Sequence, residues 1–98
     1  MKRLISAICV LFFLLPLSAQ ETYQKETFIS SRGDTLQYRL LQPENMKKSE
    51  KYPLVLFLHG AGERGNDNER QLTHGGRMFL NPVNREKYPA FVLAPQCP

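Results

Sequence analysis

An uninterrupted apolar run at residues 54–58 ends at His59 and passes directly into a loop with glycines at positions 60, 62 and 65. Because the run has no alternation of apolar and polar residues, it predicts a strand covered on both faces, as in a parallel sheet flanked by helices. Loops at the carboxyl ends of such strands are where α/β proteins place their functional groups. The pattern therefore predicts an α/β fold with a functional loop after His59.

Two alternating segments, residues 26–30 and 35–41, predict a β-hairpin closed by a turn at residues 31–34. In the second segment Leu36, Tyr38 and Leu40 share one face, and the polar residues between them share the other. This period of two is typical of a strand that is buried on one side only. We expect the hairpin to form a half-exposed antiparallel edge of the sheet.

A second apolar run, residues 90–94, is preceded by Glu-Lys-Tyr-Pro, the same four residues that precede the first run. Each proline falls at the first position of a strand, where its missing N–H group is least costly. The separation of the two runs is close to the size of one βαβ unit. They therefore predict neighbouring parallel strands joined by a right-handed crossover.

The segment between these strands predicts only short helical turns, near residues 69–73 and 77–80. Asn68 and Gln71 have the spacing of a capping box, with Asn66 and Asp67 as further cap candidates, and Asn81-Pro82 is expected to end the helical structure. The apolar residues expected to face the sheet are Leu72, Phe79 and Leu80.

Residues 1–19 have the form of an export signal. Lys2 and Arg3 precede an apolar run, residues 4–17, that is long enough for a signal-peptide core and short for a membrane span. Cleavage after Ala19 would leave residues 20–98 as one incomplete domain. The sequence therefore predicts a periplasmic or extracellular protein with no stable membrane anchor after cleavage.

The charge and the cysteine content bear on the possible partners of the protein and on its disulfide bonds. The net charge is +4, and no basic cluster would remain after loss of the signal, which argues against a nucleic-acid partner. Cys97 would then be the remaining thiol, either buried and free or half of a bridge whose partner is missing.

Residues 20–98 are also near the lower size limit for a self-sufficient core. We expect the sequence to stop inside a domain.

Residues 60–65 match Gly-x-Gly-x-x-Gly, the dinucleotide-binding fingerprint, but their context does not fit it. The polar residues 66–70 extend the loop where the motif needs a long helix, and the next strand ends without an acidic residue for the ribose. His59 and His74 likewise have no third ligand at a suitable spacing for zinc. We therefore expect neither a cofactor nor a metal.

An oxyanion loop fits this segment better, because backbone N–H groups held at a turn stabilise the negative charge that develops in acyl transfer. The sequence Leu-His-Gly-Ala-Gly-Glu-Arg-Gly-Asn-Asp-Asn at residues 58–68, followed by Gln71-Leu72 and by residues 88–98, resembles the secreted bacterial esterase and predicted-peptidase branch of the α/β-hydrolases. That branch is similar to the phospholipase/carboxylesterase and prolyl-oligopeptidase-like groups. The resemblance covers about residues 28–98, in the order of the first four strands of the fold.

This resemblance implies a serine hydrolase acting on a small ester or peptide substrate. Ala61 and Gly62 match the positions whose backbone N–H groups form part of the oxyanion hole. The Gly-x-Ser-x-Gly nucleophile elbow does not occur in these 98 residues, and neither do the Asp and His that would follow it. The chain is therefore expected to be inactive by itself.

Three further side chains of the loop have structural explanations. His59 has no nucleophile to serve, so we expect its imidazole to brace the loop rather than to act as a base. Glu63 and Arg64 are either a bracing ion pair, which we prefer, or groups that face the substrate.

Two functions remain open at this point. One is the N-terminal fragment of a secreted serine hydrolase, a carboxylesterase or peptidase, that carries the oxyanion loop and lacks the nucleophile. The other is a short secreted, non-catalytic, β-rich binding module. The nucleotide sequence after the codon for Pro98 distinguishes them, since an open or frameshifted continuation favours the hydrolase and a genuine stop favours the module.

Overall fold

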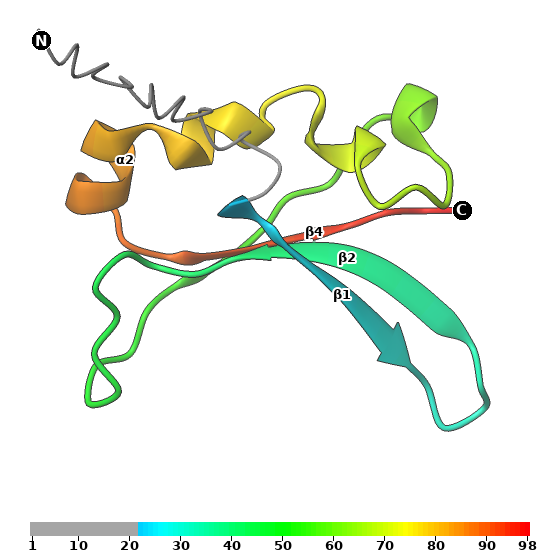
Figure 1. The fold of residues 1–98 in the computed structure, drawn as a ribbon, viewed down its shortest axis with the longest axis horizontal. Helices are drawn as coiled ribbons and strands as arrows, with labels where there is room; N and C mark the ends of the chain where they lie inside the picture. Colours follow the sequence, from blue (N-terminus) through cyan, green and yellow to red (C-terminus); the bar gives the residue numbers. More distant parts are fainter. Residues whose placement is uncertain (1–21) are drawn as a thin grey trace, which may run out of the picture.

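The computed structural model describes residues 22–98, so the predicted export signal lies outside the described residues. They form a 4-stranded mixed sheet in the order β1-β2-β4-β3, with every helical segment on one side of it (Figure 1). None of the helices among residues 22–98 is long and apolar enough to cross a membrane. In chain order the elements are β1 (Gln24–Ile29), β2 (Thr35–Leu41), β3 (Leu54–Leu56), the 3-10 helices η1 (Ala61–Glu63), η2 (Arg70–Leu72) and η3 (Gly76–Leu80), then α2 (Pro82–Lys87) and β4 (Phe91–Pro95).

The predicted hairpin is confirmed, because β1 and β2 pair antiparallel around the turn at residues 30–34. Gly33 has a φ of 87°, a conformation that residues with a Cβ rarely adopt. The expectation that this hairpin is a half-exposed edge is wrong for β2, which lies between β1 and β4. Within the hairpin, the edge strand is β1.

The buried face of β2 is also not the one that its apolar spacing suggests. Arg39 and Leu41 are each only 3% exposed, whereas Leu36 is 39% exposed. Arg39 tolerates this position because its Nη1 donates to the main-chain oxygen of Tyr23 at 2.8 Å. Burial of the guanidinium lowers the pKa of Arg39.

The two apolar runs form parallel neighbouring strands, as predicted, with Val55 opposite Val92 in the register of β3 and β4. Their inward side chains meet the helical segments in one small core. This core consists of Tyr23, Leu41, Leu72, Val92 and Ala94, with Val55, Phe57, Phe79 and Leu80 packed against it. The prediction that Leu72, Phe79 and Leu80 face the sheet is therefore confirmed.

The opposite face of the sheet is bare in the described part of the chain. Leu54, Leu56 and Leu58 are 63%, 57% and 68% exposed, although they alternate with the partly buried Val55 and Phe57. The prediction that both faces of this run are covered is wrong here, because all the helical segments lie on the other side (Figure 1). The strand is also shorter than predicted, since β3 ends at Leu56.

The crossover contains the two predicted helical turns, η2 and η3, and one helix that was not predicted. Asn81 does not end helical structure but caps α2, because its Oδ1 accepts from the N–H groups of Val83 and Asn84 at 2.9 and 3.3 Å. Pro82 occupies the first turn of α2, where the missing N–H needs no partner. The pair that looks like a helix terminator is therefore a helix start.

Candidate active site

The loop that follows β3, residues 59–68, lies beside the residues that follow β4; we call it the glycine loop. Figure 1 shows the η1 turn close to the end of β4, where the C-terminus is marked. Two hydrogen bonds join the segments: the Gly65 N–H donates to the Cys97 oxygen at 2.9 Å, and the Cys97 N–H donates to Nε2 of the His59 side chain at 3.0 Å. The carboxyl ends of two neighbouring parallel strands therefore meet in one site.

Ala61 and Gly62 open the η1 turn, which is closed by the Glu63 N–H donating to the Gly60 oxygen at 3.1 Å. Both residues are exposed. Within residues 22–98, the N–H groups of Ala61 and Gly62 donate no hydrogen bond. The first N–H groups of a helical turn have no partner inside the turn, so two adjacent donors remain for an outside acceptor. Their role as oxyanion donors stays a prediction.

His59 makes the contacts of a brace, as the sequence suggests. Because its Nε2 accepts from the Cys97 N–H, the proton of the neutral ring is on Nδ1, which donates to the Gly60 oxygen at 2.6 Å. The imidazole thus ties the first turn of the glycine loop to the end of β4. Both ring nitrogens are used within the protein, so neither is left to act on a substrate.

Cys97 is exposed and free in the described part of the chain, which contradicts the first of the two alternatives, a buried free thiol, and leaves the second, half of a bridge, untested. Its contribution to the site comes from the backbone. Both its N–H and its carbonyl oxygen bond to the glycine loop.

Glu63 and Arg64 do not form the predicted ion pair. Arg64 donates from Nε and Nη2 to the main-chain oxygen of Pro98 at 3.0 and 2.8 Å, and Glu63 Oε1 lies 3.3 Å from Nε2 of His74. The two side chains therefore tie the loop to two different segments of the chain. No group of three His, Cys, Asp or Glu side chains in residues 22–98 could hold a metal ion.

Gln96 is the site residue that sequence reasoning missed. Its side chain is 2% exposed. Its Nε2 donates to the Glu63 oxygen at 3.1 Å and to Asp67 Oδ1 at 2.8 Å, and its Oε1 accepts from the Asn68 N–H at 2.7 Å. A polar residue directly after a buried strand was the available signal, because that position is the carboxyl end of β4.

The predicted capping box at Asn68 and Gln71 is not formed as such. The N-cap of η2 is Glu69, and Asp67 before it accepts at Oδ1 from the N–H groups of Glu69 and Arg70 at 3.0 and 3.2 Å. Asn68 has a φ of 54°, and its Oδ1 accepts from Gln71 Nε2 at 2.6 Å. Its side chain therefore points into the buried network and not along the turn.

Hydrogen bonds hold Asp67 in its ionised form. The bond from Gln96 is the largest cause, followed by that from the Glu69 N–H, and these bonds outweigh the opposing effect of burial and lower the pKa of Asp67 from 3.8 to about 2. A depressed carboxyl pKa contributes stability above the unfolded value, and this contribution is lost as the pH falls from about 4 through about 2. The side chain is 41% exposed, so solvent screens part of this effect.

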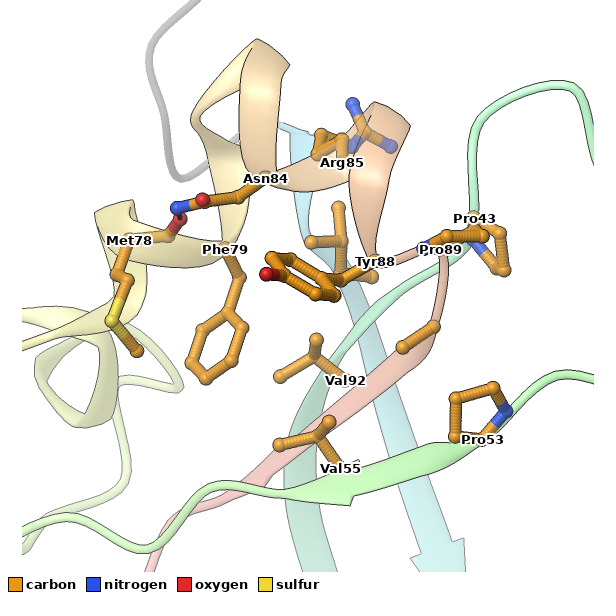
Figure 2. A pocket seen from close by; sticks show the side chains of 12 residues that line it. Pro43, Pro53, Val55, Met78, Phe79, Asn84, Arg85, Tyr88, Pro89 and Val92 are labelled. Carbon is orange, nitrogen blue, oxygen red and sulfur yellow. Dashed lines mark hydrogen bonds between the residues drawn. The ribbon is translucent and has the colours of Figure 1, made fainter.

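A cavity of about 680 Å³ lies at the other end of the sheet, between the helical segments and the amino ends of β3 and β4. In Figure 2, Phe79 and Tyr88 lie over Val55 and Val92 of the sheet. Two polar side chains at its wall are bonded: Asn84 Nδ2 donates to the Met78 oxygen, and Arg85 pairs with Glu44. Among the described residues this leaves the Tyr88 hydroxyl on an otherwise mostly apolar wall, without a second free polar side chain beside it. This cavity is therefore a poor candidate for catalysis, and we place the site at the glycine loop.

Comparison with known proteins gives two similar solved structures. No protein-family profile and no curated protein sequence matches the chain. A crystal structure described as a thermostable esterase is similar over 82% of this chain and 22% of its own, with a TM-score of 0.75 and 42% identity. The CE1 ferulic acid esterase AmCE1/Fae1A from the anaerobic fungus Anaeromyces mucronatus is similar over 76% of this chain and 28% of its own, with a TM-score of 0.56 and 20% identity. The second likeness concerns the fold alone. The chain spans about a quarter of the length of these two structures.

Proposed function

Because residues 22–98 form the N-terminal part of an α/β-hydrolase of the esterase type, we propose that the protein is the N-terminal fragment of a serine hydrolase that cleaves carboxylic esters. In this proposal the glycine loop supplies the oxyanion hole. The nucleophile, base and acid come from sequence beyond Pro98. The observation that supports it most directly is the pair of unbonded N–H groups at Ala61 and Gly62, at the carboxyl end of β3.

The chemistry of these donors follows from acyl transfer. When a serine oxygen adds to the carbonyl carbon of an ester, the carbonyl electron pair moves onto its oxygen, which becomes an oxyanion. Two N–H groups that are already fixed in a turn meet this charge without reorganisation, and the stabilisation applies to the transition state more than to the bound ester. The braces at His59 and Arg64 hold the backbone that presents these groups.

We expect the complete polypeptide encoded by the gene to hydrolyse p-nitrophenyl acetate and to react with a fluorophosphonate serine probe. Residues 20–98 alone should do neither, because no nucleophile elbow occurs among them. A hybrid extends the test: residues 22–98 replace the equivalent segment of the thermostable esterase, which is 42% identical. A hybrid that folds but has no hydrolysis above background would contradict the proposal. A genuine stop after Pro98, with clean flanking sequence, would favour the non-catalytic binding module.

We also propose that the protein is exported to the periplasm or beyond, since Lys2 and Arg3 precede an apolar run of signal-core length. Mass spectrometry of the exported product should give a mature N-terminus at Gln20. A mature protein that retains residues 4–17 would contradict export by a cleaved signal.

A further inference from the structure

We propose that Gln96 is a positioning residue that fixes the glycine loop in the conformation in which Ala61 and Gly62 present their N–H groups. This inference rests on the proposed oxyanion role of that loop. The hydrogen bonds of the Gln96 side chain and its burial carry the inference.

The nitrogen and the oxygen of the Gln96 side-chain amide both form hydrogen bonds. Both hydrogens of Nε2 are donated, one to the Glu63 oxygen and one to Asp67 Oδ1, and Oε1 accepts from the Asn68 N–H. The partners fix the orientation of the amide, because the first two can only accept and the third can only donate. One side chain from the end of β4 therefore bonds to three residues of the loop.

The hydrogen bond from Gln96 to the Glu63 oxygen connects Gln96 to the proposed oxyanion donors. Glu63 is the last residue of the η1 turn, and Ala61 and Gly62 are the other two. The start of that turn is held by His59 through the Gly60 oxygen, and its end is held by Gln96 through the Glu63 oxygen. Anchoring both ends of a three-residue turn determines the direction of the N–H groups within it.

Burial of the Gln96 amide raises the free-energy cost of losing its hydrogen bonds. At 2% exposure, the Gln96 amide has little access to water, and the Asn68 N–H that it satisfies belongs to a buried residue. Removing the amide would leave the buried Asn68 N–H without its partner, which is costlier than losing a bond at the surface, and would take one donor each from the part-buried Glu63 oxygen and Asp67 Oδ1. The loop would relieve this cost by shifting, and the shift would move η1.

The test uses Gln96→Met, which keeps the length of the side chain and removes its hydrogen bonds, in the complete enzyme or in the hybrid described above. We expect kcat for p-nitrophenyl acetate to fall about ten- to a hundredfold, less than loss of a whole donor, with KM changed little. Gln42→Met is the matched control, because Gln42 is exposed and its side chain makes no hydrogen bond within residues 22–98. It should retain the parent kcat.

A double-mutant cycle separates positioning from general destabilisation. If Gln96 acts through the oxyanion donors, Gln96→Met should cost much less in the Ala61→Pro background than in the parent. In addition, carboxyl NMR should find that Gln96→Met raises the pKa of Asp67 from about 2 toward its usual range, because the bond from Gln96 is the main cause of its depression. A structural role elsewhere would give additive losses in kcat.

The outcomes keep the two proposals apart. If Ala61→Pro lowers kcat but Gln96→Met has no effect, or the two losses are additive, the positioning role is wrong and the oxyanion proposal survives. If Ala61→Pro leaves kcat unchanged, the assignment of Ala61 as an oxyanion donor fails, and with it the link from Gln96 to that donor. Should Gln96→Met not fold, Gln96→Glu keeps the acceptor for Asn68 and replaces both donated bonds with a carboxylate facing Asp67. A parent-like kcat in this variant would equally overturn the inference.

Discussion

Ala61→Pro is expected to lower kcat about 10²- to 10³-fold in the complete enzyme, with a smaller effect on KM. Proline has no backbone N–H, so the substitution deletes one proposed oxyanion donor and leaves the neighbouring donor at Gly62. The side chain itself should matter little, because Ala61 is exposed at the start of the η1 turn. Hydrolysis of p-nitrophenyl acetate under single-substrate kinetics measures both constants.

Ala61→Gly is the matched control, since it retains the N–H and changes only the freedom of the loop. Its kcat should stay close to that of the parent. Proline also restricts the conformation of the residue before it, and Gly60 already has an extended conformation with a ψ of 173°. Thermal unfolding must show that the proline variant is folded before the rates are compared. A folded Ala61→Pro enzyme with a near-parental rate would reject Ala61 as a donor and make Gly62 the next candidate.

Residues 20–98 produced alone should self-associate strongly, because both the outer face and the outer edge of β3 are open in the described part of the chain. Leu54 and Leu56 project from that face, and burying a leucine side chain contributes about 1.5–3 kcal/mol. An unpaired strand edge next to an apolar face is a template for association. We expect Leu54→Lys with Leu56→Lys to convert large oligomers mostly to monomers, measured by size exclusion with light scattering.

Val83→Lys provides the control for this effect. Val83 is 68% exposed, as apolar as the two leucines, but it lies on α2, on the other side of the sheet (Figure 1). It should leave the oligomers unchanged. A parent chain that is already monomeric and unfolds in one sharp cooperative transition would show that the bare face does not cause self-association. If further chain covers this face in the proposed hydrolase, the lysine pair should instead prevent stable folding.

The hairpin and the parallel strand pair could be predicted from sequence because their signals are local. Alternation on either side of a glycine turn specifies β1 and β2, and an unbroken apolar run specifies a strand, although not which of its faces is covered. The sequence pattern placed Arg39 on the exposed face of β2, whereas the structure places it on the buried face. A period of two tells which residues share a face, but the neighbouring elements decide which face is covered, and Arg39 found a partner in the Tyr23 carbonyl.

The start of α2 shows a different limit. Asn-Pro is read equally well as the end of one helix or the beginning of the next, because asparagine can cap an N-terminus and proline suits the first turn. The structure resolves this through two hydrogen bonds from Val83 and Asn84 to the Asn81 side chain. Whether Asn-Pro ends or begins a helix depends on the conformation of the residues that follow it, and the pair itself does not encode that conformation.

For the candidate site, the sequence by itself determined the glycine loop after an apolar strand, the likeness to α/β-hydrolases and the positions of Ala61 and Gly62. It could not identify Gln96, since glutamine has no motif and its partners are 28 to 33 residues away along the chain. Only the tertiary structure brings the end of β4 against the loop after β3. The reason is physical: a turn can be encoded by local backbone preferences, but the hydrogen bonds that fix its orientation come from whichever strand becomes its neighbour.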